Sequence, residues 1–455
     1  MSHKGLRALI SRRRLLQTAV AAGIAATGPV ARFGVRPAAA ASPWAEAPKA
    51  SKPGKLTYIY WPWGQAQDTM IPKFEENWGV KVEKIAEANI EPLFAKVMAM
   101  TAAGEQLDVI KAIPGYIGIW VKNKIIQPID GLPGVEQYKQ EMTSLSLQGM
   151  QYQGKLYGLP YYSGIFTVGY FEDLFKKAGL KDPPKTWDEM VEQAQKAKKD
   201  GVSNFPIVWV GGAGNEHVTY VWYQLVWSRG GIVFDKDLNL KVEPGSKARE
   251  SLAWWRKTFV DWKVSDPKSL ELRFIPAAKA VWTGQYVFHP ITHHYYFQWM
   301  NREGESPIAG RVKIFLMPDG GKTMGWTALE CLSASTKNKE WAWMLLQHVG
   351  GRTKNGDFEM GKFYANDAML GSGFKTVMQD PEIKKHWTRW ADVDVLAKQW
   401  DQATDLLQAV PAVAEPWFPK WQDDAVVQIQ SCLAGKITAD QACDAMLQKY
   451  KEVKR

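Results

Sequence analysis

Three histidines lie within six residues of one another in this 455-residue chain. His289 and His293 are four residues apart, a spacing that would put two metal-ligating imidazoles on one face of a helix. Pro290 removes a backbone donor inside that span, however, and no glutamate stands where a zinc hydrolase needs its base. We therefore predict no metal ion and no cofactor. For His289, His293 and His294 two interpretations remain, plain packing or a polar contact with a bound ligand, and His289 is our ligand-binding candidate.

The sequence motifs of common enzyme sites are absent. We find no Gly-x-Ser-x-Gly nucleophile elbow, no phosphate-binding loop and no dinucleotide fingerprint. Acidic pairs such as Asp423 and Asp424 fall in an amphipathic, solvated stretch. The sequence therefore predicts no catalytic residue. An exported carbohydrate-active enzyme, which would need two carboxylates flanking a cleft, is an alternative.

Most of the excess positive charge lies in the first 41 residues. The chain has 57 Lys and Arg against 47 Asp and Glu, a formal net charge of +10. Seven of the basic residues and none of the acidic ones fall in residues 1–41, which leaves 50 against 47 for the remainder. A nearly neutral chain lacks the positive field that polyanion binding needs, so we predict no nucleic-acid partner.

Residues 1–41 have the three-part order of an export signal. A basic start precedes a weakly apolar run over 15–31 and small residues up to position 41. The segment 11–16, Ser-Arg-Arg-Arg-Leu-Leu, resembles the twin-arginine signature. No later stretch has the roughly 18 uninterrupted apolar residues of a membrane span. We predict cleavage after residue 40 or 41 and a periplasmic protein that is not membrane-embedded.

The three cysteines leave one pairing open. Cys432 and Cys443 flank a predicted turn at 435–438, and in an oxidising compartment they could form a disulfide across it. Two separate buried thiols are the alternative. Cys331 falls in a predicted strand and is expected to be a free, buried thiol.

The elements that must position these residues alternate between strand and helix patterns. Strands are predicted over 55–60, 80–85 and 108–110, and amphipathic stretches over 70–78 and 92–101 separate them. This order is typical of a parallel α/β architecture.

Further along, the pattern continues and then becomes helical. Thr186 and Glu189 have the spacing of a capping box, and so do Thr438 and Gln441, which follow Gly435. Further strands are predicted over 155–160, 166–170, 205–210, 312–316 and 327–333, and helices over 247–262, from 276, over 339–349 and almost throughout from 381.

Several segments, taken together and in order, carry a family resemblance. The most specific is 154–160, Gly-Lys-Leu-Tyr-Gly-Leu-Pro; the others are 74–82, 107–110, 170–180, 183–189, 278–284, 335–342 and 433–438. The chain resembles the extracellular solute-binding proteins of ABC importers, in the sugar-binding group that includes the maltodextrin-binding proteins.

The resemblance implies an α/β fold of two lobes with a hinge and a ligand cleft between them. After the signal and a linker at 42–54, one lobe would comprise 55–163 plus 310–350. The other would comprise 166–305 plus 355–455.

The same resemblance implies a periplasmic receptor. It would capture a sugar, oligosaccharide or polyol and deliver it to the transmembrane permease subunits of an ABC transporter, acting as a monomer. A binding protein for a charged, non-sugar solute is the alternative within this class.

A sugar site needs flat aromatic rings for the apolar sugar faces and fixed polar groups for the hydroxyls. Trp61 and Trp63 end the first predicted strand, with Pro62 stiffening the backbone between them. Trp209 ends another predicted strand before a glycine-rich stretch, and Glu216 follows it. Because ligand contacts in such sheets come from loops beyond strand ends, these four are candidates, with core packing or a surface loop as the other interpretation.

The remaining candidates follow from the resemblance alone. They match positions where the family enters its hinge, stacks an aromatic ring on the ligand or adds a ring from its C-terminal helices. These candidates are Tyr161, Tyr162, Ser163, Tyr286, Trp326, Trp417 and Trp421. The sequence does not choose between Trp417 and Trp421. Trp282 is expected in the core.

Overall fold

The computed structural model describes residues 42–62, 65–213 and 217–454. The predicted export signal therefore lies outside the described residues, as do Trp63 and Glu216. Within the described part of the chain, no helix combines the length and the apolar character that crossing a bilayer requires. Residues 42–54, the predicted linker, have turns and irregular backbone up to the first strand.

Parallel strands form the centre of the first lobe. β1 (Lys55–Tyr60), β2 (Lys81–Ala86) and β3 (Val109–Ala112) are parallel and lie in the order β2-β1-β3. α1 (Ala66–Trp78) and α2 (Ile90–Ala102) connect them as crossover helices. The parallel α/β architecture predicted from the sequence is confirmed.

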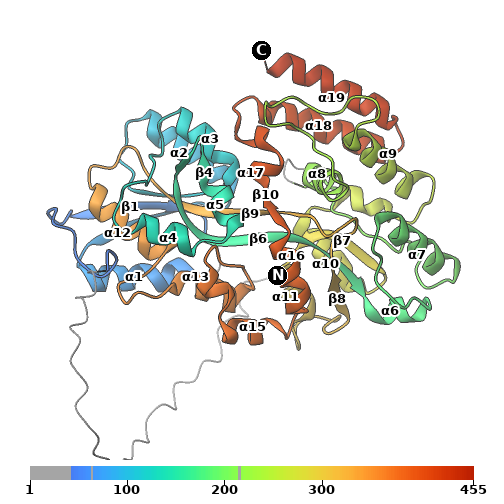
Figure 1. The fold of residues 1–455 in the computed structure, drawn as a ribbon, viewed down its shortest axis with the longest axis horizontal. Coiled ribbons are helices and arrows are strands. Elements are labelled where there is room, and N and C mark those ends of the chain that lie inside the picture. The colour runs from blue at the N-terminus through green and yellow to red at the C-terminus, as the bar shows by residue number, and fades with distance from the viewer. Residues whose placement is uncertain (1–41, 63–64, 214–216, 455) are drawn as a thin grey trace, which may run out of the picture. The chain divides into compact units, whose positions relative to one another are not determined.

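Two long strands run from the first lobe towards the second (Figure 1). β6 (Gly158–Phe171) has 14 residues, and its residues 158–165 pair antiparallel with β9 (Thr323–Leu332). The sequence pattern predicted two separate strands, at 155–160 and 166–170, and this was wrong. Residues 161–165 are buried throughout, so they show no alternation of apolar and polar residues to mark a strand.

The far end of β6 belongs to the second lobe. β7 (Phe288–His293) and β8 (Val312–Phe315) both pair antiparallel with residues 166–171 of β6. These pairings assign β8 to the second lobe, although it lies inside the range 310–350 predicted for the first. β10 (Ala403–Asp405) pairs with β9 in a region predicted as helical, and three residues are too few to leave a strand pattern.

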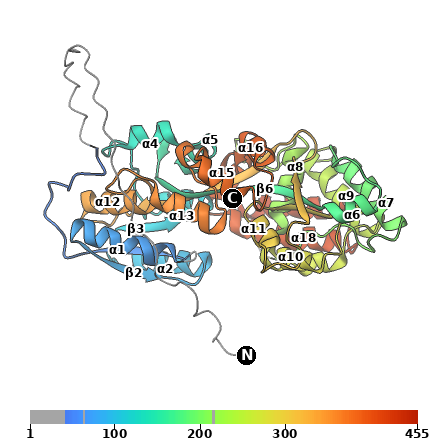
Figure 2. The ribbon, with the colours of Figure 1, turned by 90° about the horizontal axis from the view of Figure 1, so that it is seen from below.

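Helices cover the second lobe, on the side of the molecule away from β1, β2 and β3 (Figures 1 and 2). They include α7 (Trp187–Lys199), α8 (Val218–Ser228), α9 (Lys247–Val260), α18 (Phe418–Leu433) and α19 (Ala439–Val453). The last two pack on one another and on α9.

The remaining helices and turns complete the two lobes. The helices are α3 (Pro114–Lys122), α4 (Val135–Glu141), α5 (Ser144–Met150), α6 (Glu172–Lys177), α10 (Phe274–Ala280), α11 (Tyr296–Asn301), α12 (Lys339–Gly350), α13 (Glu359–Ala368), α14 (Lys375–Met378), α15 (Pro381–Trp387), α16 (Val393–Asp401) and α17 (Leu406–Ala409). Three 3₁₀ turns lie at Pro267–Glu271, Val281–Thr283 and Pro411–Ala414, and β4 (Gln151–Tyr152) and β5 (Lys155–Leu156) form a small hairpin.

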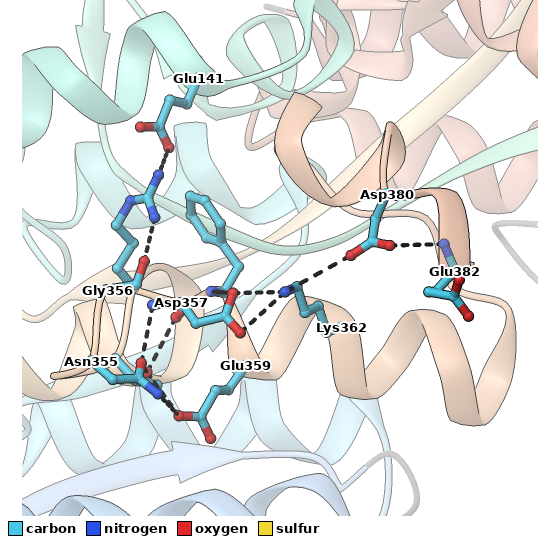
Figure 3. Close-up of polar contacts among 11 residues, drawn as sticks. Glu141, Asn355, Gly356, Asp357, Glu359, Lys362, Asp380 and Glu382 are labelled. Atoms are coloured by element: carbon cyan, nitrogen blue, oxygen red, sulfur yellow. Dashed lines mark hydrogen bonds and ion pairs between the residues drawn. The ribbon is translucent and has the colours of Figure 1, made fainter. Parts of the chain in front are cut away.

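The segment between α12 and α13 is fixed by polar contacts (Figure 3). Arg352 donates to the carboxylate of Glu141 in α4 at 2.6 Å and to the carbonyl of Gly356. Lys362 of α13 lies 2.9 Å from the carboxylate of Asp357 and 3.8 Å from that of Asp380. These contacts tie the start of α13 to α4 on one side and to the start of α15 on the other.

The two predicted capping boxes have different outcomes. At α19 the box is complete, with Thr438 and Gln441 each accepting the other's backbone N–H. At α7 the Thr186 hydroxyl accepts from Glu189 N at 3.0 Å, but the Glu189 carboxylate accepts from Lys185 N at 2.7 Å. The second half of that box therefore reaches one residue further back than predicted.

The predicted strand at 205–210 is absent. Only Ile207 forms isolated bridges, to Ser265 and Phe288, and the neighbouring backbone is irregular.

All three cysteines are free and buried in the described structure. The possible Cys432–Cys443 disulfide is therefore not formed. Burial raises the pKa of both thiols to about 12, which keeps them protonated, whereas the thiolate is the reactive form. Both side chains act as small apolar residues between α18 and α19.

Candidate functional site

A cavity of about 300 Å³ is bordered by both lobes and by the two long strands. We call it the cleft cavity; its volume is at the lower end of the range for small-molecule sites. The first lobe contributes Trp61, Asn89, Ile90, Glu91, Ile113, Pro114 and Gly115. The rest of the lining consists of Tyr162, His217, Tyr220, Arg273, Phe274, Ile275, Pro276, His293, Tyr295, Tyr296, Trp326 and Leu406.

Strand ends and helix starts bring the first-lobe residues to this cavity. Trp61 directly follows β1, Asn89 and Ile90 lie at the start of α2 after β2, and Ile113 precedes α3 after β3. The carboxyl ends of parallel strands meet at one edge of a sheet, which is where α/β proteins bind ligands. The topology of the first lobe therefore explains why these separated segments converge.

His293 reaches the cavity because the backbone of β7 is distorted. In a regular strand, residues four apart lie on the same face. Ile291 has φ 51°, which is rare for a β-branched residue, and the pairing with β6 shifts register between Thr167 and Gly169. His289 consequently lies in the interior against the Val208 carbonyl, at 3.2 Å, while His293 lines the cavity.

An aromatic wall is built across the two long strands. The indole N–H of Trp326 donates to the hydroxyl of Tyr162 at 3.0 Å. The Trp326 ring centroid lies 5.1 Å from that of Phe166 and 4.5 Å from that of His293. Gly164 lies opposite Trp326 in the sheet, and a Cβ there would come within 2.4 Å of the indole. The missing side chain lets the ring lie against the backbone of β6.

A buried lysine supports Trp61 from the interior. Lys111 Nζ lies 3.2 Å from the Trp61 carbonyl oxygen and 4.0 Å from the centroid of the Tyr161 ring. Glu330 faces Lys111 across the pairing of β3 with β9 and accepts a hydrogen bond from Tyr58 at 2.8 Å. Burial lowers the pKa of Lys111 to about 8 and raises the pKa of Glu330 to about 8. Both charged side chains are completely buried, and Lys111 contacts Trp61, which lines the cavity, directly.

Charged side chains of opposite sign reach the cavity from the two lobes. Glu91 lies in α2, and Arg273 directly precedes α10. The Nε of Arg273 donates to the Ala213 carbonyl at 2.8 Å. Both are exposed, and no ion pair involves either of them within the described ranges. Arg273 supplies the positive charge that none of the residues nominated from the sequence carries.

Three nominated residues line the cleft cavity: Trp61, Tyr162 and Trp326. Tyr161 and Ser163 lie beside it but are buried. Tyr161 packs over Lys111, and Ser163 shares hydrogen bonds with Ser146 and Thr327 at 3.0 and 2.9 Å. These two residues support the wall, and Tyr162 is the one of the three that lines the described cavity. That one of them contacts the ligand stays a prediction.

The nomination of Trp209 is corrected by the structure. Its side chain is fully buried, and its indole N–H donates to the Ser265 hydroxyl at 2.7 Å. The glycines after it serve close packing, since a Cβ at Gly211 or Gly212 would collide with the backbone of residues 269–273. The pattern that suggested a ligand loop is explained by packing against that segment.

Tyr286 and His289 are likewise interior residues. The Tyr286 hydroxyl donates to Asp266 at 2.7 Å, and neither side chain is among those that line the cleft cavity in the described structure. The side chains of Tyr286 and His289 point into the interior of the second lobe and not towards the cleft cavity.

Trp417 and Trp421 pack in the second lobe instead of reaching the cavity. Their rings surround Phe234, at centroid distances of 5.9 and 4.8 Å. The indole of Trp421 donates to the Met446 carbonyl of α19 at 3.1 Å. The C-terminal helices therefore contribute no ring to the described lining.

Several lining residues were missed by sequence reasoning. His217, Tyr220, Arg273 and the pair Tyr295 and Tyr296 follow no strand pattern in the sequence. His293 was considered together with His289 in the sequence. The two side chains point in different directions because of the backbone distortion at Ile291, which a sequence pattern does not reveal.

The sequence matches the family of bacterial extracellular solute-binding proteins over residues 69–354. Among curated relatives, a putative binding protein of Brucella abortus is 26% identical over 361 residues, covering 76% of this chain and 83% of the relative. A probable ABC transporter-binding protein of Deinococcus radiodurans is 26% identical over 316 residues, covering 67% and 71%.

Solved structures of two-lobed solute-binding proteins have the same fold. A maltose-bound protein of T. maritima superposes with a TM-score of 0.72 at 19% identity, covering 88% of this chain and 99% of the other. An ABC transporter solute-binding protein of Agrobacterium vitis with bound D-mannitol gives 0.69 at 24% identity, covering 88% and 98%. One of Agrobacterium radiobacter in complex with ribitol gives 0.70 at 19% identity, covering 88% and 99%.

Proposed function

The chain belongs to the family of bacterial extracellular solute-binding proteins, and on that premise we propose that it captures a sugar, oligosaccharide or polyol between its lobes and delivers it to the permease of an ABC transporter. The observation that carries this proposal is the composition of the cleft cavity. Rings from β1, β6 and β9 form its wall, and polar side chains from both lobes reach the same space. Stacking rings with convergent polar groups suit the apolar faces and hydroxyl rims of sugars.

The connection between the lobes supports a closing mechanism. The cavity is lined from both lobes, so a bound solute makes all of its contacts only when the lobes are close together. Such a ligand has a higher affinity for the closed form and shifts the population towards it. The permease would then recognise the closed surface.

Similar proteins with bound maltose, D-mannitol and ribitol support the choice of solute class. The proposal includes export through the twin-arginine route to the periplasm, action as a monomer, and release of the solute chemically unchanged.

Arg273 gives a specific reason to consider a second solute class. A guanidinium at the cavity can pair with a carboxylate or phosphate, as a binding protein for a charged, non-sugar solute would require. The opposing charge of Glu91 at the same cavity weakens this alternative.

A thermal-shift screen over sugars, polyols and acidic metabolites tests the proposal. A solute that binds only the native state raises the melting temperature, by an amount that follows its concentration relative to Kd. Calorimetry with the best solute should show that Trp61→Ala and Trp326→Ala each lower the affinity at least about tenfold, since each removes a stacking ring from the wall. Trp282→Ala is the matched control, because Trp282 is half-buried but does not line the described cavity.

The absence of any shift across the panel would refute solute capture of this class. Conversion of a glycan into a new product during incubation would instead establish the enzyme alternative.

A further inference from the structure

Two histidines flank one aromatic ring in the wall of the cleft cavity. His217 precedes α8 and His293 ends β7, and the ring of Phe274 lies between them, with centroid distances of 5.0 and 4.1 Å. Both imidazoles line the cavity. The sequence analysis did not consider His217, and for His293 it left packing and a polar contact with ligand open.

These two imidazoles differ from the other buried histidines in their hydrogen bonding. In the described structure, Nδ1 of His217 and Nδ1 of His293 are buried without a partner. His289, His294 and His348 each contact a backbone carbonyl through one ring nitrogen, at 3.2, 2.9 and 2.8 Å, although Nε2 of His289 and Nδ1 of His348 are also without a partner in the described structure. A buried polar atom without a partner is uncommon in proteins and calls for an explanation. At the edge of an aromatic cavity, that explanation is a partner supplied by the ligand.

Both side chains are neutral at ordinary pH. Burial lowers the pKa of His217 to about 4, with the charge of Arg273 adding to the effect. Burial also lowers the pKa of His293 well below its usual value. A neutral imidazole has one donor and one acceptor nitrogen. A hydroxyl also both donates and accepts, whereas a carboxylate or phosphate only accepts and an ammonium only donates.

We propose that His217 and His293 are specificity-determining residues that bind hydroxyl groups of the solute, and that the end of the solute at Phe274 is an uncharged, hydroxyl-bearing chain or ring of one sugar unit. This inference rests on the proposed function and narrows it. The small cavity volume supports a single unit over an oligosaccharide. The strained backbone at Ile291 supports the role of His293, because it is what moves this imidazole from the interior to the cavity.

The first experiment uses the unchanged protein and matched solutes. Calorimetry compares a hexitol, the corresponding aldonic acid and the hexitol phosphate, together with pentitols and hexoses. Singly deoxygenated forms of the best binder follow. We expect the uncharged member to bind most tightly and one or two of the deoxy forms to bind at least about tenfold more weakly, because each leaves a buried nitrogen unpaired.

The second experiment changes the imidazoles. His293→Leu and His217→Leu should each lower the affinity about tenfold or more, while His293→Gln, which keeps a donor and an acceptor, should stay within about threefold of the original protein. His289→Leu is the matched control: it lies on the same strand and is buried, but faces the interior, so it should alter the melting temperature and not the affinity.

The outcomes separate the two levels of the proposal. Tighter binding of the acid or the phosphate, or full affinity in both leucine variants, overturns the histidine inference and leaves solute capture standing. Failure of every solute class to bind overturns the proposed function itself. If a leucine variant does not fold, the deoxy series on the unchanged protein still decides the inference.

Discussion

A buried lysine contacts a residue in the wall of the cleft cavity from the interior of the first lobe. Lys111 is completely buried, and its ammonium donates to the carbonyl of Trp61, whose ring faces the cavity. Glu330 is fully buried on the neighbouring strand, and one of its carboxylate oxygens has no partner within the described residues. Buried ionisable groups are costly, so Glu330 should contribute to the dependence of stability on pH near neutrality.

Replacing Glu330 by glutamine should reduce the loss of stability on going from pH 6 to pH 8, and the remaining loss comes from Asp405. The folded-state pKa of Glu330 is about 8 and lies above its ordinary value of 4.5, so between these values the folded state holds a proton that the unfolded state has released. Stability therefore falls as pH rises through this window, by up to about 1.4 kcal/mol per pH unit. Glutamine keeps an acceptor for Tyr58 and does not titrate. Urea unfolding at both pH values measures the difference.

Glu76→Gln is the matched control, because Glu76 is exposed on α1. An equal loss of stability in Glu330→Gln and in the original protein would show that Glu330 does not titrate in this range.

Single residues show where sequence reasoning succeeds and where it stops. Trp61 could be predicted because its position after a buried strand places it at the sheet edge where ligands bind. Trp209 has the same local pattern, but its strand does not form, and the glycines beyond it are needed for backbone packing. The sequence does not show whether a glycine makes room for a ligand or for another segment of the same chain.

At the scale of elements, the pairing of β6 with β9 both connects the lobes and carries the aromatic wall. Gly164 of β6 and Trp326 of β9 are partners in this pairing, so the wall depends on a residue that has no side chain. The indole occupies the space that a Cβ at position 164 would need.

Gly164→Ala should therefore weaken solute binding with a small effect on the fold. The added methyl group must displace the Trp326 ring or the strand, since 2.4 Å is well inside van der Waals contact. Overpacking of this kind destabilises a protein by about 1–3 kcal/mol. Here it should also change the orientation of the stacking ring of Trp326. Calorimetric affinity and the near-ultraviolet signal of the tryptophans measure the displacement.

Gly54→Ala is the comparison, because a Cβ there meets nothing within 4 Å. Unchanged affinity in Gly164→Ala would mean that Trp326 does not stack on the solute.

The elements were largely predictable, and the exceptions have physical reasons. The parallel strands of the first lobe alternate with amphipathic helices, which gives two distinct periods in the sequence. β6 is buried on both faces over most of its length and so lacks the period of two. The convergence of α8, α10 and β7 at the cavity comes from long-range packing, which no local pattern encodes.

At the scale of the whole molecule, buried titratable groups should give stability a maximum near pH 6.5. Five histidines have lowered pKa values, so each binds protons more strongly when unfolded, and stability falls as pH decreases below their ordinary value of 6.5. Glu330 and Asp405, both with pKa values raised to about 8, act in the opposite sense and lower stability as pH rises towards 8.

Each group changes the free energy of unfolding by up to about 1.4 kcal/mol per pH unit. Below pH 6.5 the five histidines outnumber the two carboxyls, so stability falls as pH decreases. Above pH 6.5 the histidine contribution fades as the unfolded imidazoles lose their protons. The two carboxyls then outweigh it, together with the smaller opposing contribution of Lys111, whose pKa burial lowers to about 8. Urea midpoints between pH 5 and pH 8 should therefore rise and then fall. A midpoint that climbs steadily to pH 8 would contradict the buried, protonated state of Glu330 and Asp405.

The shared pairing of β6 and β9 also determines what kind of motion the molecule can make. β6 and β9, two of the segments that join the lobes, are hydrogen-bonded to each other over residues 158–165 of β6, so a motion that separated these strands would break that pairing. Paired strands are twisted in any case, so a change of twist would let the lobes rotate, as the proposed closing mechanism requires, with these hydrogen bonds intact. The amide protons of the β6–β9 pairing should therefore stay protected from hydrogen exchange while the lobes close over a solute and open to release it.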